Sequence, residues 1–176
     1  AVYAGADAVY LGSTLFNARM NAKNFTREDI KNAVEFCHKR GVKVYVTINT
    51  AITDKQIRDA MLLVQYLYKT GVDALIVADL GFASEIHKYF PDFPLHASTQ
   101  ASGHSSYSAK YLKDIGFSRM VIARETSKKD LALAASNSPI ELEVFVHGAL
   151  CVSCSGQCLF SSIVGGRSGN RGGCAQ

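Results

Sequence analysis

The sequence contains no tryptophan, only three prolines and no apolar run long enough to cross a bilayer. The scarcity of proline and of polar low-complexity tracts argues against disorder. Acidic residues are missing after Glu143, while Arg167 and Arg171 lie beyond it, in a chain whose formal net charge is only +4. This positively charged end either suits an anionic partner or is a short basic tail, and charge alone leaves both interpretations open.

A secretion leader is not recognisable either, because the first residues have no basic segment followed by an apolar one. The cysteine number, five, is odd. Both features disfavour disulfides and favour reduced thiols in a cytoplasmic protein with no membrane segment. The chain lacks an initiator methionine and both ends interrupt a pattern, so we expect a fragment.

What the sequence does contain is an internal repeat of a glycine followed by an apolar strand. The four copies begin at Gly5, Gly41, Gly71 and Gly116. Each glycine suits the left-handed conformation that ends a helix. Two more strands are expected at 94–98 and 142–146, and helices are expected between the strands, with starts near Thr26, Thr53, Leu80, Ser105 and Ser127.

This alternation predicts an α/β fold with parallel strands, of the (β/α)₈ TIM-barrel type. We expect a partial barrel at residues 1–150, lacking its first strand and its C-terminal part. Residues 151–176 are expected to begin a cysteine-rich segment that continues further. An open doubly wound sheet is the alternative, disfavoured because no G-x-G-x-x-G follows the first strand.

Polar residues follow the expected strand ends, and in a barrel these ends share one mouth where chemistry takes place. They are Asn17, Arg19, Asn49, Asp79, Ser98, Gln100, Arg124, Glu125 and His147. The alternative is that each simply caps the next helix. Capping explains any single residue better, but a shared polar mouth explains the whole series better.

Four cysteines lie close together near the end of the chain, at Cys151, Cys154, Cys158 and Cys174. The first three have the spacing C-x₂-C-x₃-C, and four thiols are enough for a Cys₄ site. Iron–sulfur clusters and structural zinc both use such sets, and spacing does not separate them. Unligated thiols are the third alternative. Cys37 lies on an apolar helix stripe and is expected in the core.

Two further patterns leave their function open. A cysteine nucleophile needs a histidine partner, and the spacing does not select one among His96, His104 and His147. The glycine-rich segment 165–173 lacks the G-K-[ST] ending of a P-loop. It either lays backbone N–H groups and two guanidinium groups against phosphate or carboxylate, or is a flexible loop.

The segment Glu143–Ser161, with its Gly148, Cys151, Gly156 and Cys158, resembles the signature of the U32 peptidase family, also called collagenase-like proteases. The segments 5–12 and 166–176 resemble the family too. The resemblance implies oxygen-independent hydroxylation of an RNA base, either a ribosomal RNA cytidine or a tRNA uridine, or of a ubiquinone precursor. The glycine-rich segment is closest to the ribosomal RNA branch.

The resemblance also implies a [4Fe–4S] cluster, with prephenate as a candidate co-substrate. By position, Cys151, Cys158 and Cys174 match three ligands, and the fourth is expected downstream. Cys154 stands where the family commonly has an aromatic residue, so it is either a spare thiol or a substitute ligand. Zinc remains the alternative metal.

The leading hypothesis is thus an iron–sulfur hydroxylase that acts on RNA. We expect His147, Glu125 and Arg124 as catalytic residues, the first two in proton transfer. The expected substrate-binding residues are Asn17, Arg19, Asn49, Asp79, Gln100, Arg167 and Arg171. The alternatives are a peptidase, as the family name says, and a non-catalytic iron–sulfur or zinc subunit, with a heteromeric or homo-oligomeric partner in either case.

Overall fold

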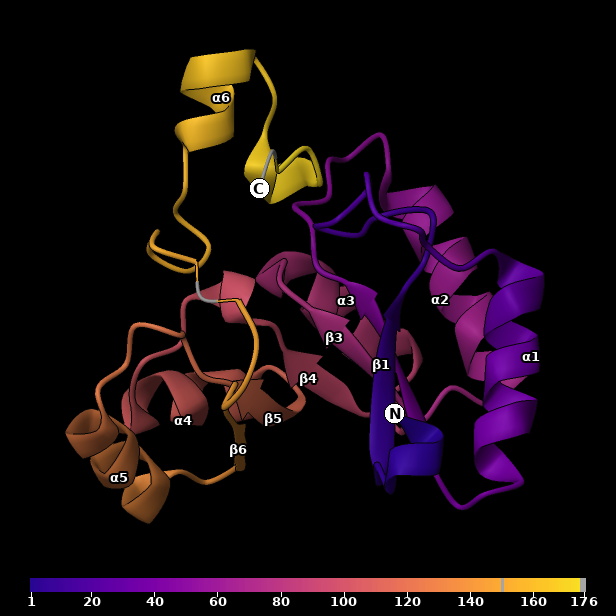
Figure 1. The fold of residues 1–176 in the computed structure, drawn as a ribbon, viewed down its shortest axis with the longest axis horizontal. Coiled ribbons are helices and arrows are strands. Elements are labelled where there is room, and N and C mark those ends of the chain that lie inside the picture. The colour runs from indigo at the N-terminus through magenta and orange to yellow at the C-terminus, as the bar shows by residue number, and fades with distance from the viewer. Residues whose placement is uncertain (150, 175–176) are drawn as a thin grey trace.

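The computed structural model describes residues 1–149 and 151–174. Six strands form one parallel sheet in the order β1-β2-β3-β4-β5-β6 (Figure 1). The strands are β1 (Ala8–Gly12), β2 (Lys43–Ile48), β3 (Ala74–Val77), β4 (Leu95–Ala97), β5 (Phe117–Val121) and β6 (Glu141–Glu143). The α-helices are α1 (Arg27–His38), α2 (Ile57–Thr70), α3 (Leu80–Tyr89), α4 (Ser106–Asp114), α5 (Lys128–Asn137) and α6 (Phe160–Gly165). Three short 3₁₀ helices are η1 (Val2–Ala4), η2 (Thr99–Ala101) and η3 (Gly169–Arg171).

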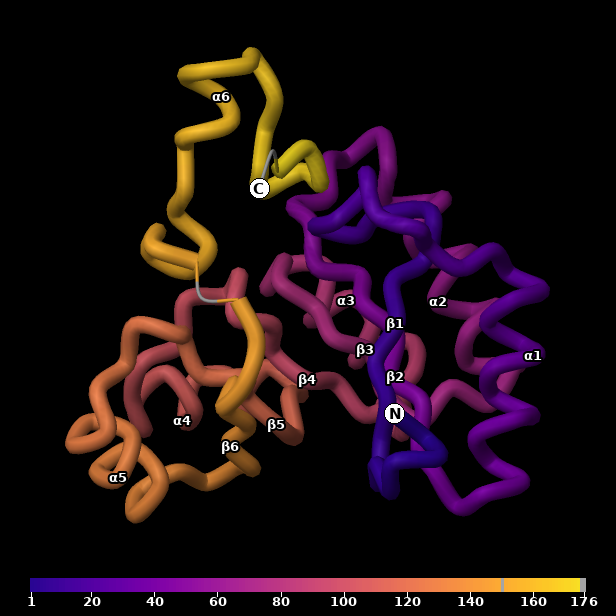
Figure 2. Tube along the Cα trace, viewed as in Figure 1, coloured from indigo at the N-terminus to yellow at the C-terminus, as the bar shows by residue number. Residues whose placement is uncertain are grey.

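Each of the first five strands is followed by a helix that returns to the start of the next strand (Figure 1). The sheet curls, with α1 to α5 along its outer side, and the trace in Figure 2 follows this curve from β1 to β6. The expected barrel-like α/β fold is therefore confirmed as a curled, open half-barrel. Its two edges are β1 and β6.

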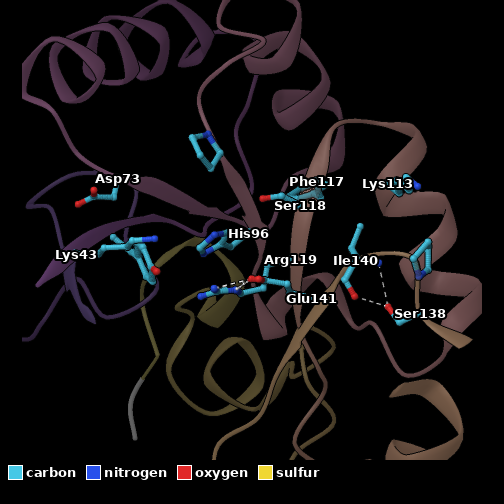
Figure 3. A pocket seen from close by; sticks show the side chains of 13 residues that line it. Lys43, Asp73, His96, Lys113, Phe117, Ser118, Arg119, Ser138, Ile140 and Glu141 are labelled. Carbon is cyan, nitrogen blue, oxygen red and sulfur yellow. Dashed lines mark hydrogen bonds and ion pairs between the residues drawn. The ribbon is translucent and has the colours of Figure 1, made fainter. Parts of the chain in front are cut away.

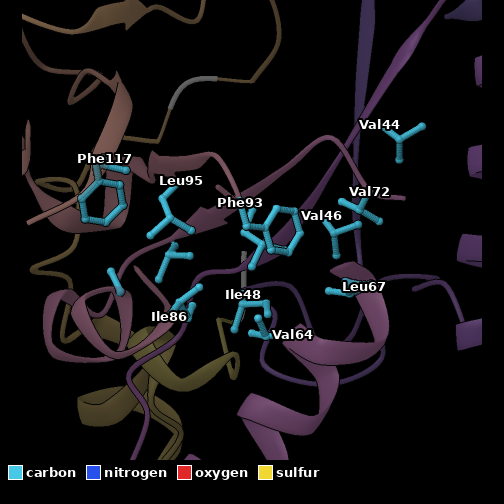
Figure 4. Close-up of a cluster of buried hydrophobic side chains, with 14 of the residues drawn as sticks. Val44, Val46, Ile48, Val64, Leu67, Val72, Ile86, Phe93, Leu95 and Phe117 are labelled. Carbon is cyan, nitrogen blue, oxygen red and sulfur yellow. The ribbon is translucent and has the colours of Figure 1, made fainter. Parts of the chain in front are cut away.

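The main core lies between the sheet and the helices. Val44, Val46 and Ile48 alternate along β2 and are all buried on this side (Figure 4). Leu75 of the next strand belongs to the same buried cluster. Because successive strand residues point to opposite faces, the residues between them face the inside of the curl. There Tyr45 forms a second, smaller cluster with Ala74 and Ile76.

Local signals set the helix ends much as the sequence predicts. Thr26 and Asp29 form a capping box at the start of α1, and Cys37 is buried on the core side of that helix as expected. Gly71 ends α2 with φ of 84°, which an L side chain rarely adopts. The other three repeat glycines also have positive φ, which confirms the repeat.

Two boundaries were predicted wrongly. α2 begins at Ile57 because Thr53 donates to the Gln56 side chain, which forms a turn before the helix. The last strand ends at Glu143, whose carbonyl accepts a hydrogen bond of 2.9 Å from the Ile122 amide at the end of the pairing with β5. Residues 144–146, which were expected to continue the strand, are exposed.

The expected boundary between residues 1–150 and 151–176 falls at Leu150. This residue lies outside the described residues, as do Ala175 and Gln176. Within the part that is described, none of the helices is long and apolar enough to span a bilayer.

The packing of the outer core gives a test of the fold. Leu75 is fully buried in β3, so Leu75→Ala should lower the free energy of unfolding by about 2–5 kcal/mol through lost burial and a cavity. Leu62 lies on the exposed side of α2, and Leu62→Ala should change the free energy of unfolding by less than about 0.5 kcal/mol. Urea denaturation measures both, and equal losses would contradict this placement of the core.

Candidate functional site

The sequence-predicted site residues follow successive strands at their carboxyl ends. Asn17 follows β1, Asn49 follows β2, Asp79 follows β3, Gln100 follows β4 and His147 follows β6. Because the strands are parallel, these loops share one end of the half-barrel, which we call the mouth.

Two of these side chains tie neighbouring loops together, and a third braces its own loop. Asn17 is buried and its amide donates to Asn24 at 2.6 Å, while Asn49 accepts from the Ala18 amide at 2.9 Å. Asp79 caps α3, and its other oxygen accepts from the Ile52 amide at 3.0 Å. The structure thus gives these residues a role in shaping the mouth, close to the capping alternative.

Ser155 fastens the cysteine-bearing segment to the mouth on the β4–β5 side. Its amide donates to Glu125 Oε1 at 2.9 Å and its hydroxyl donates to Oε2 at 2.8 Å. Its carbonyl accepts from the Ser102 hydroxyl at 2.5 Å, and its hydroxyl oxygen accepts from the Arg124 amide at 3.3 Å. Only 1% of Ser155 is exposed. The sequence did not indicate this residue, because a serine between cysteines carries no signal of its own.

Glu125 is held as a carboxylate. Partial burial acts to raise its pKa, but hydrogen bonds from the Ser155 amide, from its own backbone amide, from the Ser155 hydroxyl and from His104 lower the pKa to about 2. His104 Nε2 lies 3.1 Å from Glu125 Oε1, and His104 Nδ1 lies 2.7 Å from the Ser102 carbonyl. Glu125 therefore contacts protein groups through both oxygens.

A second attachment lies at the other side of the mouth. The Met20 amide donates to the Gly172 carbonyl at 3.3 Å, and the Ala51 amide donates to the Asn170 carbonyl at 3.0 Å. A Cβ on Gly172 would overlap the Met20 sulfur, and it would lie 2.6 Å from the Asn17 carbonyl oxygen. Residues 151–174, which we call the cysteine segment, thus reach from the β5 side to the β1 side (Figures 1 and 2).

The cysteine segment carries the four expected ligands, of which Cys154 is exposed and the other three are half-buried. Hydrogen bonds from the Ser153 hydroxyl and from the backbone N–H groups of Phe160 and Ser161 lower the pKa of Cys158, although burial acts to raise it. The lowered pKa favours the thiolate form of Cys158. Among the described residues, however, no three Cys, His, Asp or Glu side chains lie close enough to hold one metal ion. The described thiols do not by themselves complete a cluster site.

The remaining predicted residues are cations around the mouth and the cysteine segment. Arg19, Arg167 and Arg171 are exposed, and Arg19 pairs through its backbone with Gly173. His147 is exposed. Arg124 is half-buried, and its Nε has no hydrogen-bond partner within the described residues.

An ionic cluster on the inner face of the curl was not anticipated. Arg119 of β5 binds Glu141 at 2.6 Å and Glu143 at 3.2 Å, and its guanidinium lies 5.5 Å from the Tyr45 ring. The Tyr45 ring in turn meets His96 edge-on, with centroids 4.7 Å apart. These residues except Glu143 line an open cavity of about 810 Å³ at the amino ends of the strands (Figure 3).

The signal for this cluster was present in the sequence. Histidine, arginine and glutamate alternate with apolar residues along 94–98, 117–121 and 141–143, which is unusual for strands covered on both faces. Burial, and then the nearby charge of Arg119, lower the pKa of His96 to about 4, so it is neutral at pH 7.

The chain belongs to peptidase family U32, whose family model matches residues 1–176. It is 44% identical over 176 residues to the 23S rRNA 5-hydroxycytidine C2501 synthase of Escherichia coli, and the match covers 100% of this chain and 26% of that protein. It is 38% identical over 176 residues to tRNA hydroxylation protein P1 of Bacillus subtilis, with 100% of this chain and 42% of that protein covered. The chain therefore spans about a quarter of the length of the first relative and less than half of the second.

The fold is shared with the solved structure of the U32 peptidase Mk0906. The TM-score is 0.67 over 80% of this chain and 60% of that one, at 14% sequence identity. At this identity the likeness concerns the fold alone.

The buried imidazole gives a testable pH dependence. The pKa of His96 is about 4 in the folded protein against an ordinary 6.5, so the unfolded chain binds the proton more readily between these values. The stability that this group contributes is complete above pH 6.5 and is lost towards pH 4, by about 3 kcal/mol. Denaturant titrations from pH 7 to 4 measure it. His96→Gln should flatten the slope, whereas the exposed His87→Gln should not, and parallel slopes in all three proteins would contradict the burial of His96.

Proposed function

We propose that the protein catalyses, or forms the catalytic part of, an oxygen-independent hydroxylation of an RNA pyrimidine. The observation that carries the proposal is the 44% identity, over the whole chain, to a protein named for making 5-hydroxycytidine in 23S rRNA. The similarity to a tRNA hydroxylation protein points to the same substrate class. We favour a ribosomal RNA cytidine over a tRNA uridine, with the reaction in the cytoplasm.

The geometry supports a site at the mouth of the half-barrel. The cysteine segment is attached at the mouth through Ser155 on one side and Gly172 on the other. Acidic residues are absent from it, and its exposed Arg167 and Arg171 are free to approach phosphate. A positively charged segment at the carboxyl ends of parallel strands is a suitable place to receive a nucleotide.

The cofactor we propose is a [4Fe–4S] cluster, with zinc as the alternative. The support is that Cys151, Cys158 and Cys174 lie on one attached segment, and that the lowered pKa of Cys158 favours the thiolate that such a cluster needs. In the described residues these thiols are not close enough together to hold a metal ion, so the cluster would need them to come closer, and we propose that a further ligand comes from elsewhere in the protein. When bound, such a cluster would supply electron transfer or polarise an oxygen donor, and prephenate is the candidate co-substrate.

We propose separate roles for two residues of the chain, proton transfer at the base and binding of an anionic group. His147 is exposed near the cysteine segment and serves as the proton-transfer group. Arg124 holds a buried Nε without a partner in the described residues, and we propose that its guanidinium binds the carboxylate of the co-substrate or a phosphate. Arg19 adds a third exposed cation for the RNA backbone.

The reaction is tested by mass spectrometry of rRNA and tRNA from cells that lack the gene. The hydroxylated pyrimidine should disappear, return with the wild-type gene and stay absent with Cys158→Ser, while Cys37→Ala in the core of α1 should restore it. Cys154→Ser separates a spare thiol, which leaves the product, from a substitute ligand, which does not. An unchanged nucleoside profile in the deletion strain would contradict the proposal.

The same experiment separates the alternatives. A non-catalytic subunit would leave the purified full-length protein with metal but without hydroxylation of added RNA. A peptidase would cleave peptide bonds and lose that activity on chelation. Anaerobic iron and sulfide analysis of the full-length protein distinguishes the cluster from zinc.

RNA binding has its own signature. If Arg167 and Arg171 each contact a phosphate, the double variant Arg167→Ala/Arg171→Ala should weaken RNA binding by the full-length protein. It should also reduce the slope of log affinity against log salt by about 0.7 per lost contact. Filter binding from 50 to 200 mM salt measures the slope, with Lys69→Ala and Lys88→Ala on α2 and α3 as the charge-matched control. An equal slope in both double variants would exclude these two arginines from the interface.

A further inference from the structure

We infer that Glu125 is a positioning residue that seats the cysteine segment on the mouth through Ser155, rather than the proton-transfer group that its place after β5 suggests. The contacts of Glu125 and Ser155 carry this inference. Its consequence for catalysis rests on the proposed function, because the placement of the cysteines affects a reaction only if they hold the cofactor of that reaction.

Every polar group of Ser155 has a hydrogen-bond partner. Ser155 uses its amide, its carbonyl and its hydroxyl at once, and two of the three go to Glu125. A residue that is 1% exposed and has every polar group paired is fixed in place and orientation. Ser155 stands four residues after Cys151 and three before Cys158, so its position constrains where both cysteines lie relative to the mouth.

Glu125 is held in a closed ring of hydrogen bonds. Ser102 binds the Ser155 carbonyl, Ser155 binds Glu125, Glu125 binds His104, and His104 returns to the Ser102 carbonyl. Both nitrogens of His104 thus face oxygen atoms, so the ring bridges Ser102 and Glu125. A carboxylate with both oxygens engaged in this way is held in one orientation by its partners and in turn orients Ser155.

The backbone next to Ser155 lies in close contact with the loop after β4. Gly156 has φ of 73°, and a Cβ there would overlap the Gln100 carbonyl oxygen and lie 2.6 Å from the Ser102 hydroxyl. The segment approaches η2 so closely that only glycine fits. This close approach explains in physical terms why a glycine is needed between Cys154 and Cys158.

The test is hydrogen exchange of peptides from 151–158 in the full-length protein. Glu125→Ala should speed exchange there by at least about tenfold, because charge-assisted hydrogen bonds to Ser155 are lost. Glu125→Gln, which keeps one acceptor, should have a smaller effect. Glu141→Gln removes the same charge from the ion pair with Arg119 and should leave this segment unchanged, as should amides in β2 and β3 in every variant.

Turnover of RNA separates positioning from chemistry. If Glu125 positions the segment, Glu125→Gln should retain at least about a tenth of kcat, and Ser155→Ala should cause a loss similar to that in Glu125→Gln. The double variant Glu125→Ala/Ser155→Ala should be no worse than Glu125→Ala alone, because both changes remove the same contact.

Two results would overturn the inference. One is unchanged exchange of 151–158 in Glu125→Ala. The other is turnover in Glu125→Gln as low as in Glu125→Ala, with Ser155→Ala fully active, which would make Glu125 a proton carrier. Failure of the proposed function is a different result, in which the wild-type protein makes no hydroxylated nucleoside, and it leaves the exchange data unaffected.

Discussion

Parallel pairing of six strands is the constraint on which the rest of this structure depends. Because every strand runs the same way, every strand-to-helix loop emerges at one end, and polar residues far apart in sequence are brought to one mouth. The outer core of Val46, Ile48 and Leu75 fixes the helices against the sheet and thereby fixes where those loops begin. The cysteine segment then has a rigid surface on which to dock.

The sequence predicted this framework well, since its signals are local or periodic. The glycine before four of the six strands and the capping box of Thr26 and Asp29 depend on neighbours within a few residues. The end of the last strand was misjudged because Val144 to Val146 have the composition of a strand, and only the register of pairing shows that the ladder stops at Glu143.

The site was harder to predict, because its organisation depends on contacts between distant residues. Asn17, Asn49 and Asp79 lie where expected, but their partners show that they hold loops in place. The link from Glu125 to Ser155 spans 30 residues and leaves no periodic trace. The same holds for the inner ionic cluster, in which Arg119 joins strands that are adjacent only after folding. A charged inner face in place of the usual branched apolar residues marks this half-barrel as different from a simply packed one.

The two attachments of the cysteine segment differ in kind. At Ser155 a carboxylate and two hydroxyls hold the chain, whereas near Gly172 the hydrogen bonds within the described residues join backbone groups. Charge-assisted bonds are roughly twice as strong as neutral ones, so thermal opening should begin at the weaker, β1 side. Opening of the segment would then start beside Met20 and Ala51, while the Ser155 end stays attached beside β5.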